Sequence, residues 1–258
     1  MTPARFRVLG PVELLHDGDP VRLGRGTALT VLAGLLTSPN QVVPVDQLID
    51  WVWGREPPFH PRAALQNGVS RLRQLIGEPV LDTFAWGYRL HAGAGQLDLL
   101  RFDELRCAAD RAAGRGAVED AAAALDEAVG LWREPLLGNV ESLALHEAIV
   151  PGLRERYLDT IEIRAGLYIQ LGRPDPVIRD LAPVVRVHPY REPLTGQLMV
   201  ALALSGRPAD ALSAYTTLRR TLRDELGLDP SAELQRLHLK ILRADRNLDL
   251  PPFSRRWP

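Results

Sequence analysis

The sequence has one cysteine, Cys107, and one lysine, Lys240, among its 258 residues. A single cysteine cannot form an internal disulfide, and the 6 histidines lie too far apart for the ligand spacing of a structural zinc site. P-loop and Schiff-base sites need a placed lysine, whereas Lys240 lies in the helical pattern Leu-His-Leu-Lys-Ile-Leu without a glycine loop. These absences exclude redox, zinc, P-loop and Schiff-base chemistry, so we expect no metal and no cofactor.

Long hydrophobic runs are also missing. The longest apolar segments, such as Leu198–Leu204, are far shorter than the roughly 18 residues that span a bilayer. The N-terminus lacks the apolar region of a signal peptide. We therefore expect a cytoplasmic protein without membrane contact. Lys and Arg number 31 against 32 for Asp and Glu, a net charge of -1, so any basic surface must be local.

A change of pattern near residue 95 predicts two domains, 1–95 and 96–258. In the first, the apolar runs Phe6–Leu9 and Val12–Leu15 predict an opening hairpin, and His16–Pro20 predicts the break after it. Helical spacing and turn residues then predict three helices and a second hairpin, at Thr27–Leu36, Asp46–Trp53, Pro61–Ile76 and Val80–Leu90. Three helices followed by a hairpin is the element order of a winged helix.

Beyond residue 100 only amphipathic helices are expected. The tripeptide Gly172-Arg173-Pro174 recurs 34 residues later as Gly206-Arg207-Pro208, and this spacing is the period of a tetratricopeptide helix pair. Small and large apolar residues alternate at Ala209, Leu212, Tyr215 and Leu218, as stacked helix pairs require. The pattern favours a helical repeat over a non-repeating bundle.

The third predicted helix has a distinctive outer face. Residues 60–76 carry three arginines and no acid. A helical wheel places Leu65, Val69, Leu72 and Ile76 on one stripe, and polar side chains on the opposite arc. These are Gln66, Asn67, Ser70, Arg71 and Gln74. Arg can bond guanine, Gln and Asn can bond adenine, and Ser can reach bases or phosphate, so the face suits a major groove. An ordinary solvated face has the same composition, and this alternative stays open.

Short motifs are spread over nearly the whole chain. The N-terminal motifs are Phe6-Arg-Val-Leu-Gly-Pro11, Leu48-Ile-Asp50, Val52-Trp-Gly54, Leu65-Gln66, Val69-Ser-Arg-Leu-Arg73 and Gly87-Tyr-Arg-Leu90. The C-terminal motifs are Leu131-Trp-Arg133, His188-Pro-Tyr-Arg-Glu192, Gln197-Leu-Met199, Ser205-Gly-Arg207 and Glu225-Leu-Gly-Leu-Asp-Pro230. Together these motifs resemble the Streptomyces antibiotic regulatory protein family, in its small stand-alone form.

The resemblance implies a mostly α protein. Its N-terminal half would be an OmpR-like winged helix-turn-helix, which is α+β. The second half would be an all-α, tetratricopeptide-like bacterial transcriptional activation domain. The family's function implies an activator, not an enzyme, that binds double-stranded promoter DNA at tandem direct repeats and recruits RNA polymerase holoenzyme. The promoters would belong to secondary-metabolite (antibiotic) clusters, and the resemblance allows a side-by-side homodimer on the DNA.

The family's DNA contacts carry over to nine positions of this sequence: Trp53, Arg62, Gln66, Asn67, Ser70, Arg71, Arg73, Thr83 and Tyr88. Arg71 matches an arginine that reaches base edges, and Arg73 matches one that meets phosphate. The indole of Trp53 either bonds a phosphate or fills a hydrophobic gap. Thr83 and Tyr88 are weaker wing candidates, and packing of the Tyr88 ring under the hairpin is the favoured interpretation.

Two features concern the limits of the resemblance. Gly68 lies inside the predicted recognition helix, where glycine costs about 1 kcal/mol relative to alanine, and a close approach of the backbone to DNA would account for it. The chain ends at Pro258 and shows no receiver domain before the winged helix, so we expect control by abundance rather than by aspartyl phosphorylation. We also expect residues 1–100 to fold alone and to bind the promoter without activating it.

Two competing functional classes stay open. A helical-repeat receptor for a small molecule, or an enzyme, would use Trp132, His146, Tyr157 and His188, whose spacing matches no catalytic pattern. Each of these residues is more simply explained as core or surface. A protein-binding scaffold that never contacts DNA is the other class, and the basic helix with a wing argues against it.

Overall fold

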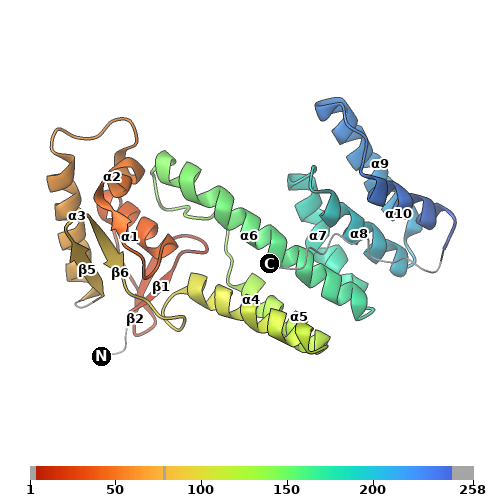
Figure 1. Ribbon diagram of the computed structural model, residues 1–258, viewed down its shortest axis with the longest axis horizontal. Coiled ribbons are helices and arrows are strands. Elements are labelled where there is room, and N and C mark those ends of the chain that lie inside the picture. The colour runs from red at the N-terminus through yellow and green to blue at the C-terminus, as the bar shows by residue number, and fades with distance from the viewer. Residues whose placement is uncertain (1–3, 78–79, 246–258) are drawn as a thin grey trace. The chain divides into compact units, whose positions relative to one another are not determined.

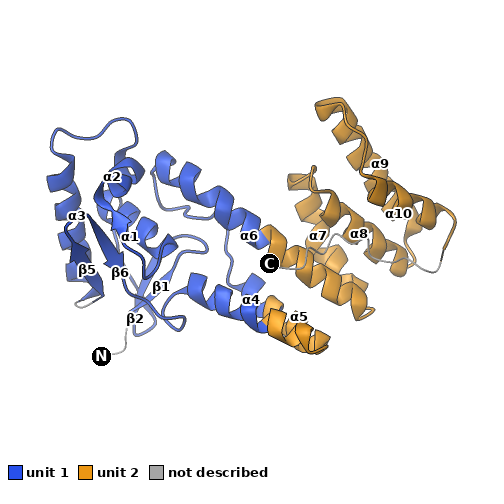
Figure 2. Ribbon diagram, viewed as in Figure 1, with its two compact units in different colours: residues 1–108, 126–157 blue, residues 109–125, 158–258 orange. Residues whose placement is uncertain are grey.

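The computed structural model describes residues 4–77 and 80–245 (Figure 1). Contacts divide the chain into two compact units, one of residues 1–108 and 126–157 and the other of residues 109–125 and 158–258 (Figure 2). Helices α4 (Asp98–Gly114), α5 (Val118–Gly130) and α6 (Leu143–Gln170) contribute residues to both units.

The domain ranges predicted from the sequence differ from these compact units. Their boundary near residue 95 lies between the last strand and α4, where the strand pattern ends, whereas the first unit also takes in part of the later helical segment. The ranges 1–95 and 96–258 therefore stay a prediction. Their end segments, residues 1–3 and 246–258, lie outside the described residues.

An antiparallel sheet opens the first unit. Strands β1 (Arg5–Arg7), β2 (Glu13–His16) and β3 (Asp19–Val21) pair in that order. The sequence predicted the first two strands but assigned Asp19 and Pro20 to a break. Pro20 pairs with Leu15 in β3, which is an edge strand of this sheet. An edge strand tolerates proline because it needs no ladder hydrogen bond on its outer side. Pro20 therefore reads as a turn residue in the sequence although it lies in β3.

The three predicted helices and the second hairpin are confirmed as a winged helix. Their bounds are α1 Thr27–Thr37, α2 Val45–Trp53, α3 Pro61–Ile76, β5 Leu81–Phe84 and β6 Gly87–Leu90. A short strand, β4 (Val43–Pro44), completes a second sheet in the order β4-β6-β5. A strand of two residues is too short to show an alternation of apolar and polar side chains, so no sequence pattern predicts β4. Leu32, Leu48, Leu65 and Leu72 are fully buried where the helices meet.

Later segments of the chain complete the core of this winged helix. The Asn139 side chain accepts from the Val12 amide at 2.7 Å and donates to the Val12 carbonyl at 2.9 Å. The Arg133 amide donates to the Leu9 carbonyl at 2.8 Å, and the Ser142 hydroxyl donates to the Trp51 carbonyl. The same hydrophobic cluster includes side chains from residues 126–157, namely Ala128, Leu136, Leu137, Val140, Leu145 and Leu153. The N-terminal half therefore shares its core with the helical half.

A buried carboxylate supports the loop after β1. Asp98, in the first turn of α4, accepts from the amides of Val8 at 2.8 Å and Leu9 at 3.1 Å. Burial raises the pKa of the Asp98 carboxyl above its usual value, although these amides and the Arg133 guanidinium, 4.0 Å away, act in the opposite direction. The desolvation effect is the largest of these influences.

The second unit is helical throughout its described residues. It continues from the shared helices through α7 (Pro174–Val187), α8 (Glu192–Leu204) and α9 (Pro208–Thr221) to a π-helical turn, Leu222–Leu226, and α10 (Ala232–Leu242). Helix α8 packs against both α7 and α9. Its residues 194–202 are all buried, as expected for a helix between two neighbours.

The repeated tripeptide has the same conformation at both sites. Gly172 and Gly206 have φ values of 66° and 72°, the left-handed region in which glycine is favoured at the end of a helix. Pro174 and Pro208 then begin α7 and α9 at the first helical turn, where the missing proline N–H costs nothing. The sequence period thus corresponds to a recurring helix–turn–helix junction, and the tetratricopeptide-like all-α fold is confirmed.

Candidate nucleic-acid interface

Helix α3 has the two faces that the helical wheel predicts. Leu65, Val69, Leu72 and Ile76 are buried, with at most 3% of their surface exposed. The polar side chains on the opposite side are all exposed; they are Gln66, Asn67, Ser70, Arg71 and Gln74. None of these five makes a side-chain hydrogen bond or ion pair within the described ranges 4–77 and 80–245. Their donors and acceptors are therefore free to bind a partner.

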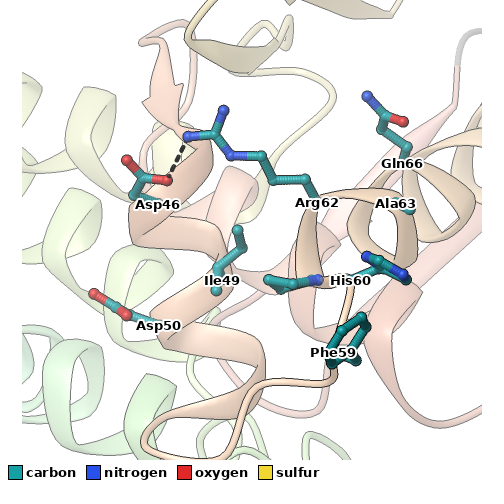
Figure 3. Close-up of a pocket in the computed structure, with 9 residues that line it drawn as sticks. Asp46, Ile49, Asp50, Phe59, His60, Arg62, Ala63 and Gln66 are labelled. Atoms are coloured by element: carbon teal, nitrogen blue, oxygen red, sulfur yellow. Dashed lines mark hydrogen bonds and ion pairs between the residues drawn. The ribbon is translucent and has the colours of Figure 1, made fainter.

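The three arginines of α3 have different surroundings. The Arg62 guanidinium forms an ion pair with Asp46 of α2 at 3.1 Å, and both side chains are well exposed (Figure 3). Arg73 donates to the Leu81 carbonyl at 3.1 Å and to the Thr83 hydroxyl, both on β5. Arg71 has no such partner within the part of the chain that the structure describes, and its guanidinium lies beside Gly24.

Gly68 faces the protein interior. It is buried, and a Cβ atom at this position would lie 2.8 Å from the Thr27 methyl group at the start of α1. The close approach that requires glycine here is the crossing of α3 over α1. The prediction that Gly68 allows the helix backbone to approach DNA closely is therefore wrong, because this side of α3 is covered by the protein itself.

The wing hairpin places its two predicted residues differently. Thr83 and Tyr88 are paired across β5 and β6. Thr83 is exposed, whereas Tyr88 is only 6% exposed and belongs to the hydrophobic cluster, which favours the packing interpretation of its ring. Trp86, in the turn between the strands, is 58% exposed and was not predicted from the sequence. A tryptophan in a two-residue hairpin turn lies too far from the core to be buried. Its position in the predicted turn could therefore have identified it as an exposed residue of the wing.

Charges on the wing are partly neutralised. Asp82 of β5 accepts from the His91 ring and from the Arg89 guanidinium, each at 2.7 Å. These two hydrogen bonds, with His91 the larger influence, hold the pKa of the Asp82 carboxyl below its usual value. Arg89 also covers the Phe84 ring, 4.8 Å from its centroid. Arg89 is therefore held within the hairpin.

Trp53, at the end of α2, is half-buried and packs against the hydrophobic cluster. Its indole N–H has no hydrogen-bond partner in the described residues. The ring thus fills a gap while its N–H stays available, so both interpretations of this residue remain compatible with its position.

A surface depression of about 670 Å³ adjoins the N-terminal part of α3 (Figure 3). Its lining residues are Asp46, Ile49, Asp50, Phe59, His60, Pro61, Arg62, Ala63 and Gln66. Phe59 is 93% exposed and meets the His60 ring edge-on at 4.6 Å. Gln66 connects this depression to the polar face of α3.

The aromatic residues considered for a receptor or enzyme have local packing and hydrogen-bonding roles. Trp132 packs against Phe102 and Tyr157, with ring centroids 5.1 and 5.2 Å away. The His146 ring pairs with the Val140 carbonyl at 2.9 Å, and His188 ends α7. In the described residues no group of His, Cys, Asp and Glu could hold a metal ion. No described helix is long and apolar enough to cross a membrane.

Two family models match consecutive parts of the chain. Residues 18–90 match the family model described as transcriptional regulatory protein, C terminal. Residues 97–242 match the bacterial transcriptional activator domain. The two matches meet close to the predicted boundary between the domains.

The chain is similar to three regulators along most of its length. It is 38% identical to the transcriptional regulatory protein EmbR of Mycobacterium tuberculosis, over 92% of this chain and 63% of EmbR. It is 37% identical to the regulatory protein AfsR of Streptomyces coelicolor, over 93% of this chain and 24% of AfsR. It is 34% identical to the regulatory protein DnrI of Streptomyces peucetius, over 95% of this chain and 94% of DnrI. The chain thus spans about two thirds of EmbR and a quarter of AfsR.

A solved structure has the same fold. The M. tuberculosis EmbR structure, in complex with a low affinity phosphopeptide, superposes with a TM-score of 0.88 at 37% identity, over 96% of this chain and 67% of that one. The family models, the length of the match to DnrI and this structural agreement lead to one assignment. The chain belongs to the Streptomyces antibiotic regulatory protein family of transcriptional regulators.

Proposed function

We propose that this protein is a sequence-specific DNA-binding transcriptional activator. Helix α3 would enter the major groove, and the β5–β6 wing would follow the adjacent minor groove or backbone. The observation that carries the proposal is the exposed, unpartnered face of α3, whose side chains match the hydrogen-bonding groups of base edges. The alternative, an ordinary solvated face, does not account for the β5–β6 hairpin beside the helix.

Base and phosphate contacts would be divided among the predicted residues. Arg71 would address a guanine, Gln66 and Asn67 adenines, and Ser70 either a base or a phosphate. Arg62 is available to a phosphate because an exposed ion pair such as that with Asp46 contributes at most about 1 kcal/mol and is screened by salt. The Trp53 indole N–H would bond the DNA backbone. On the wing, Thr83 is exposed, whereas the Tyr88 ring is only 6% exposed and would support the hairpin from within.

The targets would be tandem direct repeats at promoters of secondary-metabolite clusters. AfsR and DnrI are named as regulatory proteins, and the family to which they and this chain belong suggests this class of target. The helical half would hold RNA polymerase holoenzyme, and neighbouring protomers would lie side by side on the DNA. Such a regulator performs no catalysis and works in the cytoplasm, where the bacterial chromosome lies.

Footprinting with the intact chain on regions upstream of neighbouring genes tests the proposal. Protection should appear head to tail with a spacing of about 10 to 11 base pairs, which places successive α3 helices on one side of the duplex. Binding should weaken steeply as salt rises because phosphate contacts release counterions. Palindromic protection would contradict the tandem arrangement. An absence of salt-dependent DNA binding would overturn the function and favour a receptor or scaffold.

A purified transcription assay tests activation separately. The intact chain should raise transcription from the footprinted promoter, because favourable contacts to polymerase increase its occupancy. Arg236→Ala removes an exposed arginine of α10 in the second unit and controls for the loss of one positive charge outside the DNA-binding face. This variant should bind the promoter with the affinity of the unchanged protein. If the intact chain binds the promoter but does not raise transcription, the proposed DNA binding stands and the proposed activation is wrong.

A further inference from the structure

The outer strand of the wing has one sheet neighbour. In the order β4-β6-β5, strand β6 pairs with both of the others, whereas β5 pairs with β6 alone among the described strands. An edge strand held on one side moves more easily than a central strand. Whatever holds the free side of β5 therefore controls how rigidly the wing is presented.

Arg73 lies on that free side. It is in the last turn of α3, and its Nη2 atom donates both to the Leu81 carbonyl and to the Thr83 hydroxyl of β5. The two acceptors are two residues apart along the strand, so one guanidinium spans a stretch of β5. Both are neutral, which means that the guanidinium charge is retained while its geometry is fixed. Hydrogen bonds from a charged donor are among the stronger ones.

We propose that Arg73 is a positioning residue that fixes the wing hairpin against the recognition helix and is not itself a phosphate contact. This inference rests on the proposed function. Within α3 the proposal divides the labour: Arg71, without a partner, addresses the DNA, while Arg73, bound to β5, sets the distance between helix and wing. Thr83 becomes the acceptor of this link and not a direct DNA contact.

Hydrogen exchange of the intact protein without DNA tests the link directly. Replacing Arg73 by Met keeps the approximate length of the side chain and removes the guanidinium that donates the hydrogen bonds. Backbone amides of β5 and β6 should then exchange about tenfold faster, while those of α1 should be unchanged. Thr83→Val removes one of the two acceptors and should accelerate exchange in the same segment by a smaller factor, whereas Thr83→Ser, which keeps the hydroxyl, should not. Unchanged exchange of the wing in Arg73→Met would overturn the proposal.

DNA binding supplies the readout that separates positioning from phosphate contact. Arg73→Met should weaken promoter binding several-fold and leave the dependence of log affinity on log salt unchanged. A lost phosphate contact would instead reduce that slope by about one unit, and this result would overturn the proposal. The effects of Arg73→Met and Thr83→Val should be non-additive because both variants remove the hydrogen bond between Arg73 and Thr83.

Arg71→Met is the matched control. It removes an exposed arginine from the same helix but should leave exchange of the wing as it is, because Arg71 has no bond to β5. Faster wing exchange in this variant would contradict the link through Arg73. If the intact chain binds no promoter DNA, the proposed function fails, whereas the exchange experiment still decides whether Arg73 holds the wing.

Discussion

The shared core makes a strong prediction about the isolated N-terminal half. Among the core side chains that a fragment of residues 1–100 lacks are four leucines and valines of residues 136–145 that are at most 5% exposed: Leu136, Leu137, Val140 and Leu145. Burial of an aliphatic side chain contributes about 1.5 to 3 kcal/mol, and taking about half of it as contact with residues 1–100 gives a loss of about 3 to 6 kcal/mol. The hydrogen bonds of Asn139 and of the Arg133 amide add about 1 kcal/mol each.

This loss is comparable with the whole stability of a domain, about 5 to 15 kcal/mol. We therefore expect the 1–100 fragment to remain largely unfolded, contrary to the expectation from the sequence pattern. A fragment of residues 1–157 retains every residue of the first compact unit and should unfold cooperatively. Urea titration followed by circular dichroism and tryptophan fluorescence compares the two. A cooperative transition of the 1–100 fragment, within about 1 kcal/mol of the longer one, would refute the reasoning.

Three further predictions concern single residues. Arg71→Ala should lose about 1 to 3 kcal/mol of preference for its contacted base, measured as the ratio of affinities for promoter and substituted sites; equal losses on both sites would contradict the base contact. Gly68→Ala should destabilise the protein in urea by about 1 to 3 kcal/mol because its Cβ would lie 2.8 Å from the Thr27 methyl, and the added change Thr27→Ser should recover part of the loss. Since the folded pKa of Asp98 is raised, its contribution to stability is present at low pH and falls as pH rises through that pKa; Asp98→Asn should flatten the pH dependence of unfolding free energy above the usual aspartate pKa of 3.8, and identical profiles would contradict it.

Sequence reasoning succeeded where a local period determines the structure. The bounds of α3 follow from Pro61 at its start, the apolar stripe and Gly77 after it, and the structure has the same bounds. It failed for β3, because Pro20 is a turn former in composition and an edge-strand residue by position. Register with a distant strand is a tertiary property that no short window of sequence contains.

The different hydrogen-bonding surroundings of Arg71 and Arg73 also depend on tertiary structure. Both arginines carry the same charge on the same helix, and their two-residue spacing turns them about 200° apart without indicating what lies beside either side chain. Their roles diverge because β5 folds back beside the last turn of α3 and supplies acceptors only to Arg73. Gly68 is similar, since the reason for its small size is the crossing of α1, which follows from packing and not from helix propensity.

The repeated junction of the second unit allows the helical half to be lengthened by duplication of a helix pair. The segment from Pro174 to Arg207 begins at one such junction and ends at the next, with the same glycine conformation before each proline. Duplicating this 34-residue block in the gene would join Arg207 to a second Pro174 through the tripeptide that already occurs there. Because stacked helix pairs contact mainly their neighbours, an added pair would find the surface it needs on the preceding one. The helical half can therefore be extended by whole units without inventing a new turn.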